Sequence, residues 1–168
     1  VGISFWTSAM AKMAAALFVP MEAGRLPGKR KTAMTIGALV QIVAAVHYFY
    51  RRDVWVSTGE TPTVYRYVDW LITVPLQMVE FYFILAAVAV VSAGMFWRLM
   101  IGSLVMLVAG YLGEAGLVNA WLGFVVGMAG WAYIRDEIFA GEAGKVSAES
   151  APEAVQKSFS TMRMIVTV

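Results

Sequence analysis

Three polar side chains within one apolar segment have the types and the spacing to pass protons across a membrane. Asp69, Thr73 and Glu80 all lie in the apolar stretch 65–90. An ionisable group at membrane depth costs on the order of a few kcal/mol, so it is functional by default. At 100° per residue, Thr73 and Glu80 fall within about 40° and about 20° of Asp69, so the three share one face of a helix.

The two carboxyl groups on this face are too far apart to exchange a proton directly. At 1.5 Å per residue, Asp69 and Glu80 stand roughly 16 Å apart along the helix, about half the thickness of the hydrocarbon core. Burial favours the protonated form of a carboxyl group, so Glu80 is expected to be ready to donate. The pair predicts two stations of one proton path, with a gap that another group must bridge.

Two basic residues are expected to act on Asp69. Arg66 precedes it by one turn and can stabilise its ionised form. His47, the only histidine, lies near the extracellular end of the preceding span and can hydrogen-bond Asp69 if the two helices are neighbours. Simpler interpretations stay open. Arg66 and Asp69 could form a structural ion pair, His47 could only pack at the interface, and Gln77 could only bond a neighbouring helix.

The composition indicates that these residues lie in a membrane. Of the 168 residues 60% are hydrophobic and 14% are charged, which leaves too little polar surface to coat a soluble globule. Three long blocks carry no formal charge (32–50, 81–97 and 117–134), and about 20 residues span a hydrocarbon core. The absence of cysteine excludes disulfides and thiolate metal sites. The net charge of +2, with basic residues at loop positions, gives no indication of nucleic-acid binding.

These blocks predict an all-α membrane protein with a single transmembrane domain over residues 1–168. Five complete helices and the start of a sixth are expected, at about 3–21, 32–50, 65–90, 96–112, 118–139 and 153–168. The polar stretch 141–152 is predicted to be a loop. The connection 54–63 has alternating character and could form a short extracellular hairpin.

The basic residues of the first loop predict the orientation. Arg25, Lys29, Arg30 and Lys31 cluster there, and the positive-inside rule puts them in the cytoplasm and the N-terminus outside. The chain opens at Val1 and ends in an apolar run, so both ends are expected to be truncated.

The segment from Thr63 to Leu76 resembles the third helix of microbial rhodopsins. It contains the pattern Arg-Tyr-x-Asp-Trp-x-x-Thr-x-Pro-Leu, and its continuation 77–82, Gln-Met-Val-Glu-Phe-Tyr, resembles the proteorhodopsin group. Further similarity lies at 102–108 and 110–116, and the resemblance extends over nearly the whole chain.

The resemblance implies a seven-helix bundle around all-trans retinal, held by a lysine of the seventh helix. It implies a light-driven ion transporter rather than an enzyme, one that moves protons outward across the bacterial inner membrane and forms a homo-oligomer in the lipid bilayer. Asp69 matches the proton acceptor, Glu80 the cytoplasmic-side donor, and Thr73 the third member of their triplet. Because the chain stops before that lysine, the implied function belongs to its parent protein.

The resemblance also assigns the residues around these stations. Arg66 matches the arginine below the counterion, His47 the acceptor's partner, and Trp6 a residue that meets this histidine across an oligomer interface. Four positions match the retinal pocket: Trp70, Met106, Gly110 and Trp131.

Three further residues bear on colour and charge. Tyr48 matches a tyrosine near the counterion. Gln77 matches the position that is Gln in blue-absorbing and Leu in green-absorbing forms, which predicts a blue-absorbing pigment. Lys12 is foreign to the family's first helix and is expected to reach toward the lipid face, as long basic side chains do.

Two alternatives stay open from the sequence. A sensory rhodopsin that signals to a membrane partner would cycle slowly and would not acidify the medium in light; the presence of Glu80 argues against it. A retinal-free transporter could use Asp69 and Glu80 as its proton sites, and it would develop no visible band with retinal.

Overall fold

The computed structural model describes residues 2–60 and 62–167, and these residues form helices without a strand. The all-α prediction is therefore confirmed for the part of the chain that is described. The helices are α1 (Gly2–Ala23), α2 (Gly28–Thr58), α3 (Thr63–Ala86), α4 (Ala93–Glu114), α5 (Ala120–Phe139), α6 (Glu142–Ser150) and α7 (Glu153–Thr167).

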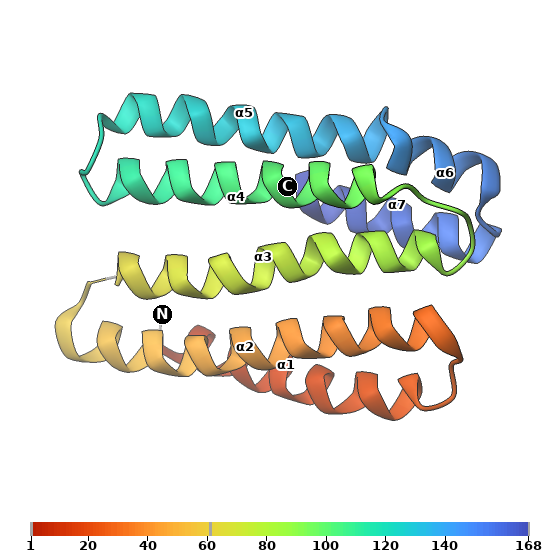
Figure 1. Ribbon diagram of the computed structural model, residues 1–168. Coiled ribbons are helices and arrows are strands. Elements are labelled where there is room, and N and C mark those ends of the chain that lie inside the picture. The colour runs from red at the N-terminus through yellow and green to blue at the C-terminus, as the bar shows by residue number, and fades with distance from the viewer. Residues whose placement is uncertain (1, 61, 168) are drawn as a thin grey trace.

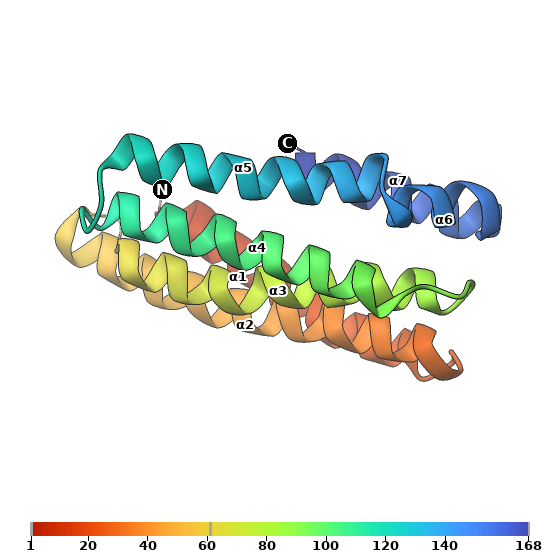
Figure 2. The ribbon, with the colours of Figure 1, turned by 45° about the horizontal axis from the view of Figure 1, so that its top comes forward.

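Helices α1 to α5 pack in the order of the sequence, each against the next and antiparallel to it (Figures 1 and 2). Short connections force this arrangement, because a helix that ends in a tight loop must return beside its predecessor. Helix α3 lies in the middle of the row, between α2 and α4, and α6 and α7 also contact it. Residues of α3 can therefore face several helices at once.

Local signals set several helix ends. The Ser92 hydroxyl accepts a hydrogen bond from the Met95 N–H at 3.1 Å and caps the start of α4. The Asn119 side chain accepts from the Trp121 N–H at 2.9 Å and caps α5 in the same way. Gly59 ends α2 with φ of 72°, a left-handed conformation that favours glycine.

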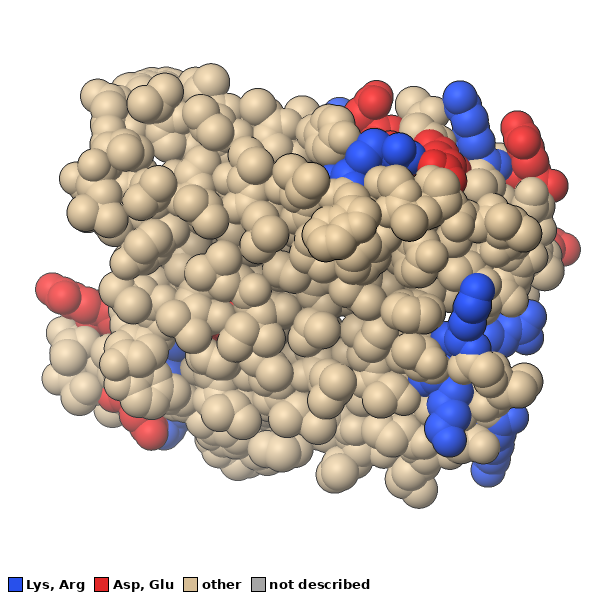
Figure 3. All heavy atoms as spheres, viewed as in Figure 1, with Lys and Arg blue, Asp and Glu red and all other residues tan. Residues whose placement is uncertain are grey.

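Four of the described helices, α1 to α4, are long and apolar enough to cross a membrane. Helix α5 is 20 residues long, but Arg135, Asp136 and Glu137 lie in its last five residues, so its composition alone does not identify a span. Figure 3 shows a broad uncharged area, with charged side chains gathered toward the two ends of the helices. This distribution fits a hydrocarbon layer between two aqueous faces.

Three sequence-based expectations about local structure are wrong. The stretch 141–152, predicted to be a loop, contains α6. The expected hairpin at 54–63 does not form, because α2 continues through Thr58 and α3 begins at Thr63. The third helix ends at Ala86, short of the expected position 90.

Helix α6 forms because small residues let it pack against the end of α5. Ala143, Gly144 and Ser147 are its buried residues, and a Cβ on Gly144 would collide with the Phe139 carbonyl oxygen. Its polar composition suggested a loop, but Glu142 at its start enters a hydrogen-bond network with residues of α5 and with Ser92 and Arg98 at the start of α4. Tertiary contacts override the weak local preference here.

Glycines also bring α4 and α5 into backbone contact. A Cβ on Gly123 would lie 2.7 Å from Gly113 Cα, and one on Gly130 would lie 2.9 Å from the Met106 backbone nitrogen. A Cβ on Gly127 would lie 3.4 Å from the Met106 carbonyl oxygen, an ordinary contact distance. Small residues permit such close packing in membranes, where hydrophobic attraction between helices is weak.

Gly130→Ala is expected to separate α4 from α5 and to lower the thermal unfolding midpoint by several degrees, since overpacking costs about 1–3 kcal/mol. Gly127→Ala, on the same helix, should have little effect. Circular dichroism melting in detergent compares the two variants. Equal midpoints would show that the close approach at Gly130 is not a stabilising contact.

Candidate functional site

Asp69 is the most deeply buried carboxylate among the described residues, with 2% of its surface exposed. It projects from α3 toward α2. Its Oδ1 lies 3.8 Å from His47 Nδ1, and its Oδ2 lies 3.9 Å from Arg51 Nη1. Both distances exceed a good hydrogen bond, so Arg51 acts on Asp69 mainly through its charge, and His47 does so when it is protonated. The structure therefore brings His47 beside Asp69, but the hydrogen bond expected between them is not formed.

One oxygen of Asp69 has no hydrogen-bond partner among the described residues. Oδ1 is fully buried and unpaired. His47 Nδ1 lies 2.8 Å from the Val43 carbonyl oxygen, and since a carbonyl only accepts, the Nδ1 proton points there. The Thr73 hydroxyl donates to the Asp69 backbone carbonyl at 3.0 Å rather than to its carboxylate. A buried acceptor is rarely left unpaired, so Oδ1 is suited to receive a donor from another group.

Arg66 differs from its sequence-based expectation, because its ion-pair partner is Glu114 on α4. Its guanidinium also lies 5.3 Å from the centre of the Trp70 ring, and the Thr63 hydroxyl donates to the Glu114 carboxylate at 3.0 Å. Arg66 therefore joins α3 to α4. The arginine beside Asp69 is Arg51, which sequence reasoning missed because the second helix was expected to end at residue 50, whereas α2 continues through Thr58.

Lys12 also lies elsewhere than expected. It is half-buried, and its Nζ is 5.4 Å from the centre of the Tyr48 ring on α2. The expectation that it reaches toward the lipid is therefore wrong. The unusual placement of a lysine in an apolar helix was the signal that marked it in the sequence.

Glu80 lies half-buried between α3 and α2. A Cβ on Gly37 of α2 would stand 2.8 Å from Glu80 Oε1, so the carboxyl group occupies the space that this glycine leaves open. Among the described residues Glu80 has no ion pair. Its carboxyl group therefore faces a neighbouring helix, where it lacks a compensating charge.

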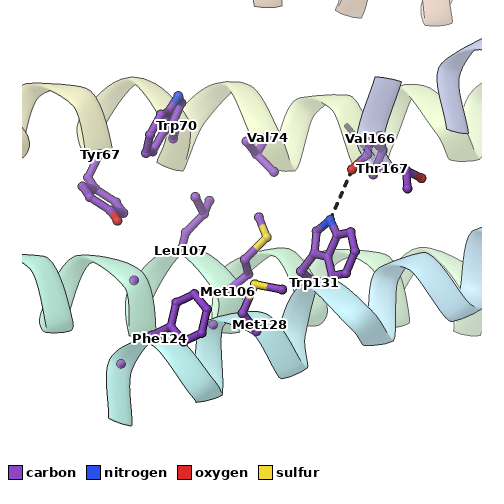
Figure 4. Close-up of a pocket in the computed structure, with 13 residues that line it drawn as sticks. Tyr67, Trp70, Val74, Met106, Leu107, Phe124, Met128, Trp131, Val166 and Thr167 are labelled. Carbon is purple, nitrogen blue, oxygen red and sulfur yellow. Dashed lines mark hydrogen bonds between the residues drawn. The ribbon is translucent and has the colours of Figure 1, made fainter. Parts of the chain in front are cut away.

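An apolar pocket of about 570 Å³ lies on the other side of α3, between α3, α4 and α5 (Figure 4). Aromatic and sulfur-containing side chains converge on it, and glycines of α4 and α5 keep its wall open. The Trp131 indole donates to the Val166 carbonyl at 3.2 Å and closes one side. The pocket has the size and character of a site for a small apolar ligand.

Four of the six predicted ligand-contacting residues line this pocket, namely Trp70, Met106, Gly110 and Trp131. Gln77 does not line it, although it follows the lining residue Val74 by three positions on α3. Tyr48 lies away from it, on α2 between the side chains of Lys12 and Arg51.

A charged network joins three helices at the opposite end from the Arg66 pair. Arg98 on α4 binds Glu137 through Nε at 2.8 Å and Glu142 through Nη2 at 2.7 Å. The Ser92 hydroxyl donates to Glu142 at 2.6 Å and its backbone N–H donates at 2.8 Å. The bonds from Ser92, and then the charge of Arg98, hold the pKa of Glu142 below its ordinary value. The network fixes the start of α6 to α4.

A family model described as "Bacteriorhodopsin-like protein" matches residues 1–168. The chain is 48% identical over 168 residues to the "Blue-light absorbing proteorhodopsin" of Gamma-proteobacterium Hot 75m4, and covers 66% of that relative. It is 47% identical over 165 residues to the "Green-light absorbing proteorhodopsin" of Gamma-proteobacterium EBAC31A08, again 66% of its length. The chain thus spans just under two thirds of the curated relatives it matches.

Solved structures share the fold. The crystal structure of the blue light-absorbing proteorhodopsin from Med12 superposes with a TM-score of 0.81 at 48% identity, over 99% of this chain and 73% of that one. The Exiguobacterium sibiricum rhodopsin gives a TM-score of 0.85 at 26% identity, over 99% and 74%. Xanthorhodopsin, whose structure is titled a light-driven ion pump with dual chromophore, gives 0.80 at 22% identity over 98% and 72%. The expected rhodopsin bundle is thereby confirmed.

The network around Glu142 predicts a pH-dependent stability. Because its folded-state pKa is lowered, Glu142 stabilises the protein above the unfolded pKa of about 4.3 and loses this effect as pH falls through the lower folded value. Glu142→Gln should lower the melting temperature by a few degrees at pH 7, and the difference from wild type should vanish in acid. Glu149→Gln, exposed on the same helix, is the control. A difference that persists below pH 3 would contradict the role of the ionised carboxylate.

Proposed function

This chain belongs to the family of bacteriorhodopsin-like proteins, and from that premise we propose that it forms part of a light-driven pump that moves protons outward across a bacterial membrane. The observation that carries the proposal is the buried Asp69, with an unpaired oxygen and two basic neighbours. The proteorhodopsins it resembles are named for light absorption. The chain would contribute the greater part of a single transmembrane domain.

The pocket beside α3 fits retinal. It is apolar, and two tryptophans, Trp70 and Trp131, lie on its wall with Met106 and Gly110. Joined to a lysine amine as a protonated Schiff base, all-trans retinal would supply light absorption and a transferable proton on the Schiff-base nitrogen. The aromatic residues would hold the polyene in one orientation, and Gly110 would leave it room. Asp69 lies on the α2 side of α3, and its unpaired Oδ1 would accept a hydrogen bond from a cationic donor there.

Asp69 would accept the proton. Before light the basic groups of His47 and Arg51 favour its ionised form, so it is available as a base. The Thr73 hydroxyl bonds the backbone of Asp69 at 3.0 Å and leaves the carboxylate unencumbered. In a dry site, transfer of a proton from a cationic donor to this carboxylate would replace two buried charges by two neutral groups and would remove their desolvation cost.

Glu80 would supply the next proton from the cytoplasmic side. Its carboxyl group is held between α3 and α2 without an ion pair among the described residues, so the protonated form is favoured. A donor in this position supports a pump rather than a sensor, since a fast return of the proton gives net transport in each cycle. We further propose that the N-terminus lies outside the cell, because Arg25, Lys29 and Lys31 gather at the α1–α2 connection.

The tests use a protein that carries these 168 residues and extends to the length of its relatives, called the extended protein below. With all-trans retinal in cells or vesicles, it should show a visible band and acidify the outside in light. Asp69→Asn should abolish the light-driven acidification, because the amide cannot accept the proton, and should shift the band to the red. Asp53→Asn, which changes an exposed carboxylate paired with Arg52, should leave both unchanged.

Other outcomes would identify the alternatives. A visible band with a slow cycle and no acidification would favour a sensory photoreceptor. The absence of a band after reconstitution would contradict the retinal assignment. Undiminished acidification in Asp69→Asn would remove Asp69 from the path.

The colour of the pigment gives a separate prediction. We propose that Gln77 selects blue absorption, because its polar amide alters how the ground and excited charge distributions of a polyene are stabilised. Gln77→Leu should move the absorption band of the extended protein to the red. Gln41→Leu is the control, since it makes the same amide-to-leucine change on α2, a helix that contributes no residue to the pocket lining. An unshifted band in Gln77→Leu would refute the assignment.

A further inference from the structure

Two cations, one from α1 and one from α2, lie close to the ring of Tyr48. Lys12 Nζ lies 5.4 Å from the ring centre and Arg51 Cζ lies 5.1 Å from it. The Arg51 guanidinium also lies 5.7 Å from the Phe5 ring on α1. The faces of aromatic rings attract cations, the more so when water is excluded. The rings therefore hold both cations within the apolar part of the bundle.

Arg51 has its charge compensated by Asp69. Only 9% of its surface is exposed, its Nη1 lies 3.9 Å from Asp69 Oδ2, and its Nε has no hydrogen-bond partner among the described residues. A buried charge without a counterion is strongly destabilising. The buried pair Arg51 and Asp69 therefore depend on each other, and the charge of Lys12 also acts on Asp69.

The other charged groups around α3 act elsewhere. On the α4 side Arg66 is paired with Glu114. Helices α6 and α7 contact the opposite end of α3 through an apolar cluster that includes Phe81 and Phe159. His47 faces Asp69 from α2, but its Nδ1 proton is directed at the Val43 carbonyl. Within the described residues, the permanent positive charges nearest Asp69 thus come from α1 and α2.

We propose that Lys12 and Arg51 are positioning residues for Asp69: the charges of both favour the ionised form of its carboxylate, and Arg51 lies beside Oδ2 and leaves Oδ1 without a hydrogen bond. Their part in proton transfer rests on the proposed function, because it takes Asp69 to be the acceptor. Their electrostatic effect on Asp69 does not depend on light or on retinal. Arg51, rather than Arg66, is then the arginine that supports this carboxylate.

The experiment titrates Asp69 in the extended protein without retinal, in lipid nanodiscs. Infrared spectroscopy follows the carboxyl band that disappears in Asp69→Asn. In Arg51→Met the midpoint of its protonation should move to higher pH by about one unit or more, because an opposite charge at this distance favours the ionised form. Lys12→Met should move it in the same direction by less. Arg51→Lys keeps the positive charge, so its midpoint should lie much closer to the wild-type value than that of Arg51→Met.

Matched controls separate this effect from general damage. Arg52→Met changes the neighbouring arginine, whose partner is Asp53, and should leave the midpoint in place. Arg66→Met should move it less than Arg51→Met. An unmoved midpoint in both Arg51→Met and Lys12→Met would overturn the proposal, as would a larger shift in Arg66→Met. If Arg51→Met does not fold, the test uses Arg51→Lys and Lys12→Met. An unmoved midpoint in Lys12→Met would then overturn the proposal.

The outcome of this titration does not depend on whether the proposed function is correct. A protein that neither binds retinal nor pumps can still show the predicted midpoints. Conversely, a working pump whose Asp69 midpoint ignores Arg51 would keep its function and lose this inference.

Discussion

The buried pair of Asp69 and Arg51 is the interaction on which the candidate site depends. Asp69 lies in the interior of an apolar helix, where an uncompensated carboxylate would cost several kcal/mol. Its ionised form is tolerable because Arg51 and His47 approach it from α2, and because aromatic rings hold Arg51 and Lys12 in place. The same environment leaves one carboxylate oxygen without a partner, so the structure combines a stable charge with a free acceptor.

Helix α3 separates this charged side from the apolar pocket. Its Asp69 face meets α2, whereas Trp70 and Val74 turn toward α4 and α5. Glycines bring the α4 and α5 backbones together on the far side. An ion pair joins α4 to α3 at one end of α4, and another joins α4 to the start of α6 at its other end. Fixed neighbours on both faces give α3 one position, which is what a site with ångström-scale geometry requires.

The sequence predicted most of the fold and part of the site, for identifiable reasons. Long apolar blocks reveal helices because a membrane leaves few other solutions, and the spacing of Asp69 and Thr73 on one helix follows from helix geometry alone. Contacts between helices are not written in the local pattern. Arg51 lies beside Asp69, where Arg66 was expected, and Lys12 lies beside Tyr48. Both placements depend on how α1, α2 and α4 pack. Helix α6 was missed because its stability comes from Arg98 and Ser92, which are distant in sequence.

We propose that Asp69 and Glu80 act in that order, as acceptor and then donor, on one proton path. Time-resolved infrared difference spectroscopy on the extended protein after a flash tests it directly. We expect a protonated-carboxyl band to appear first, and to be absent in Asp69→Asn. A second carboxyl band, absent in Glu80→Gln, should be lost afterwards and should then recover. A photocycle in which Asp69 never gains a proton, or in which Glu80 loses its proton before Asp69 gains one, would contradict the account.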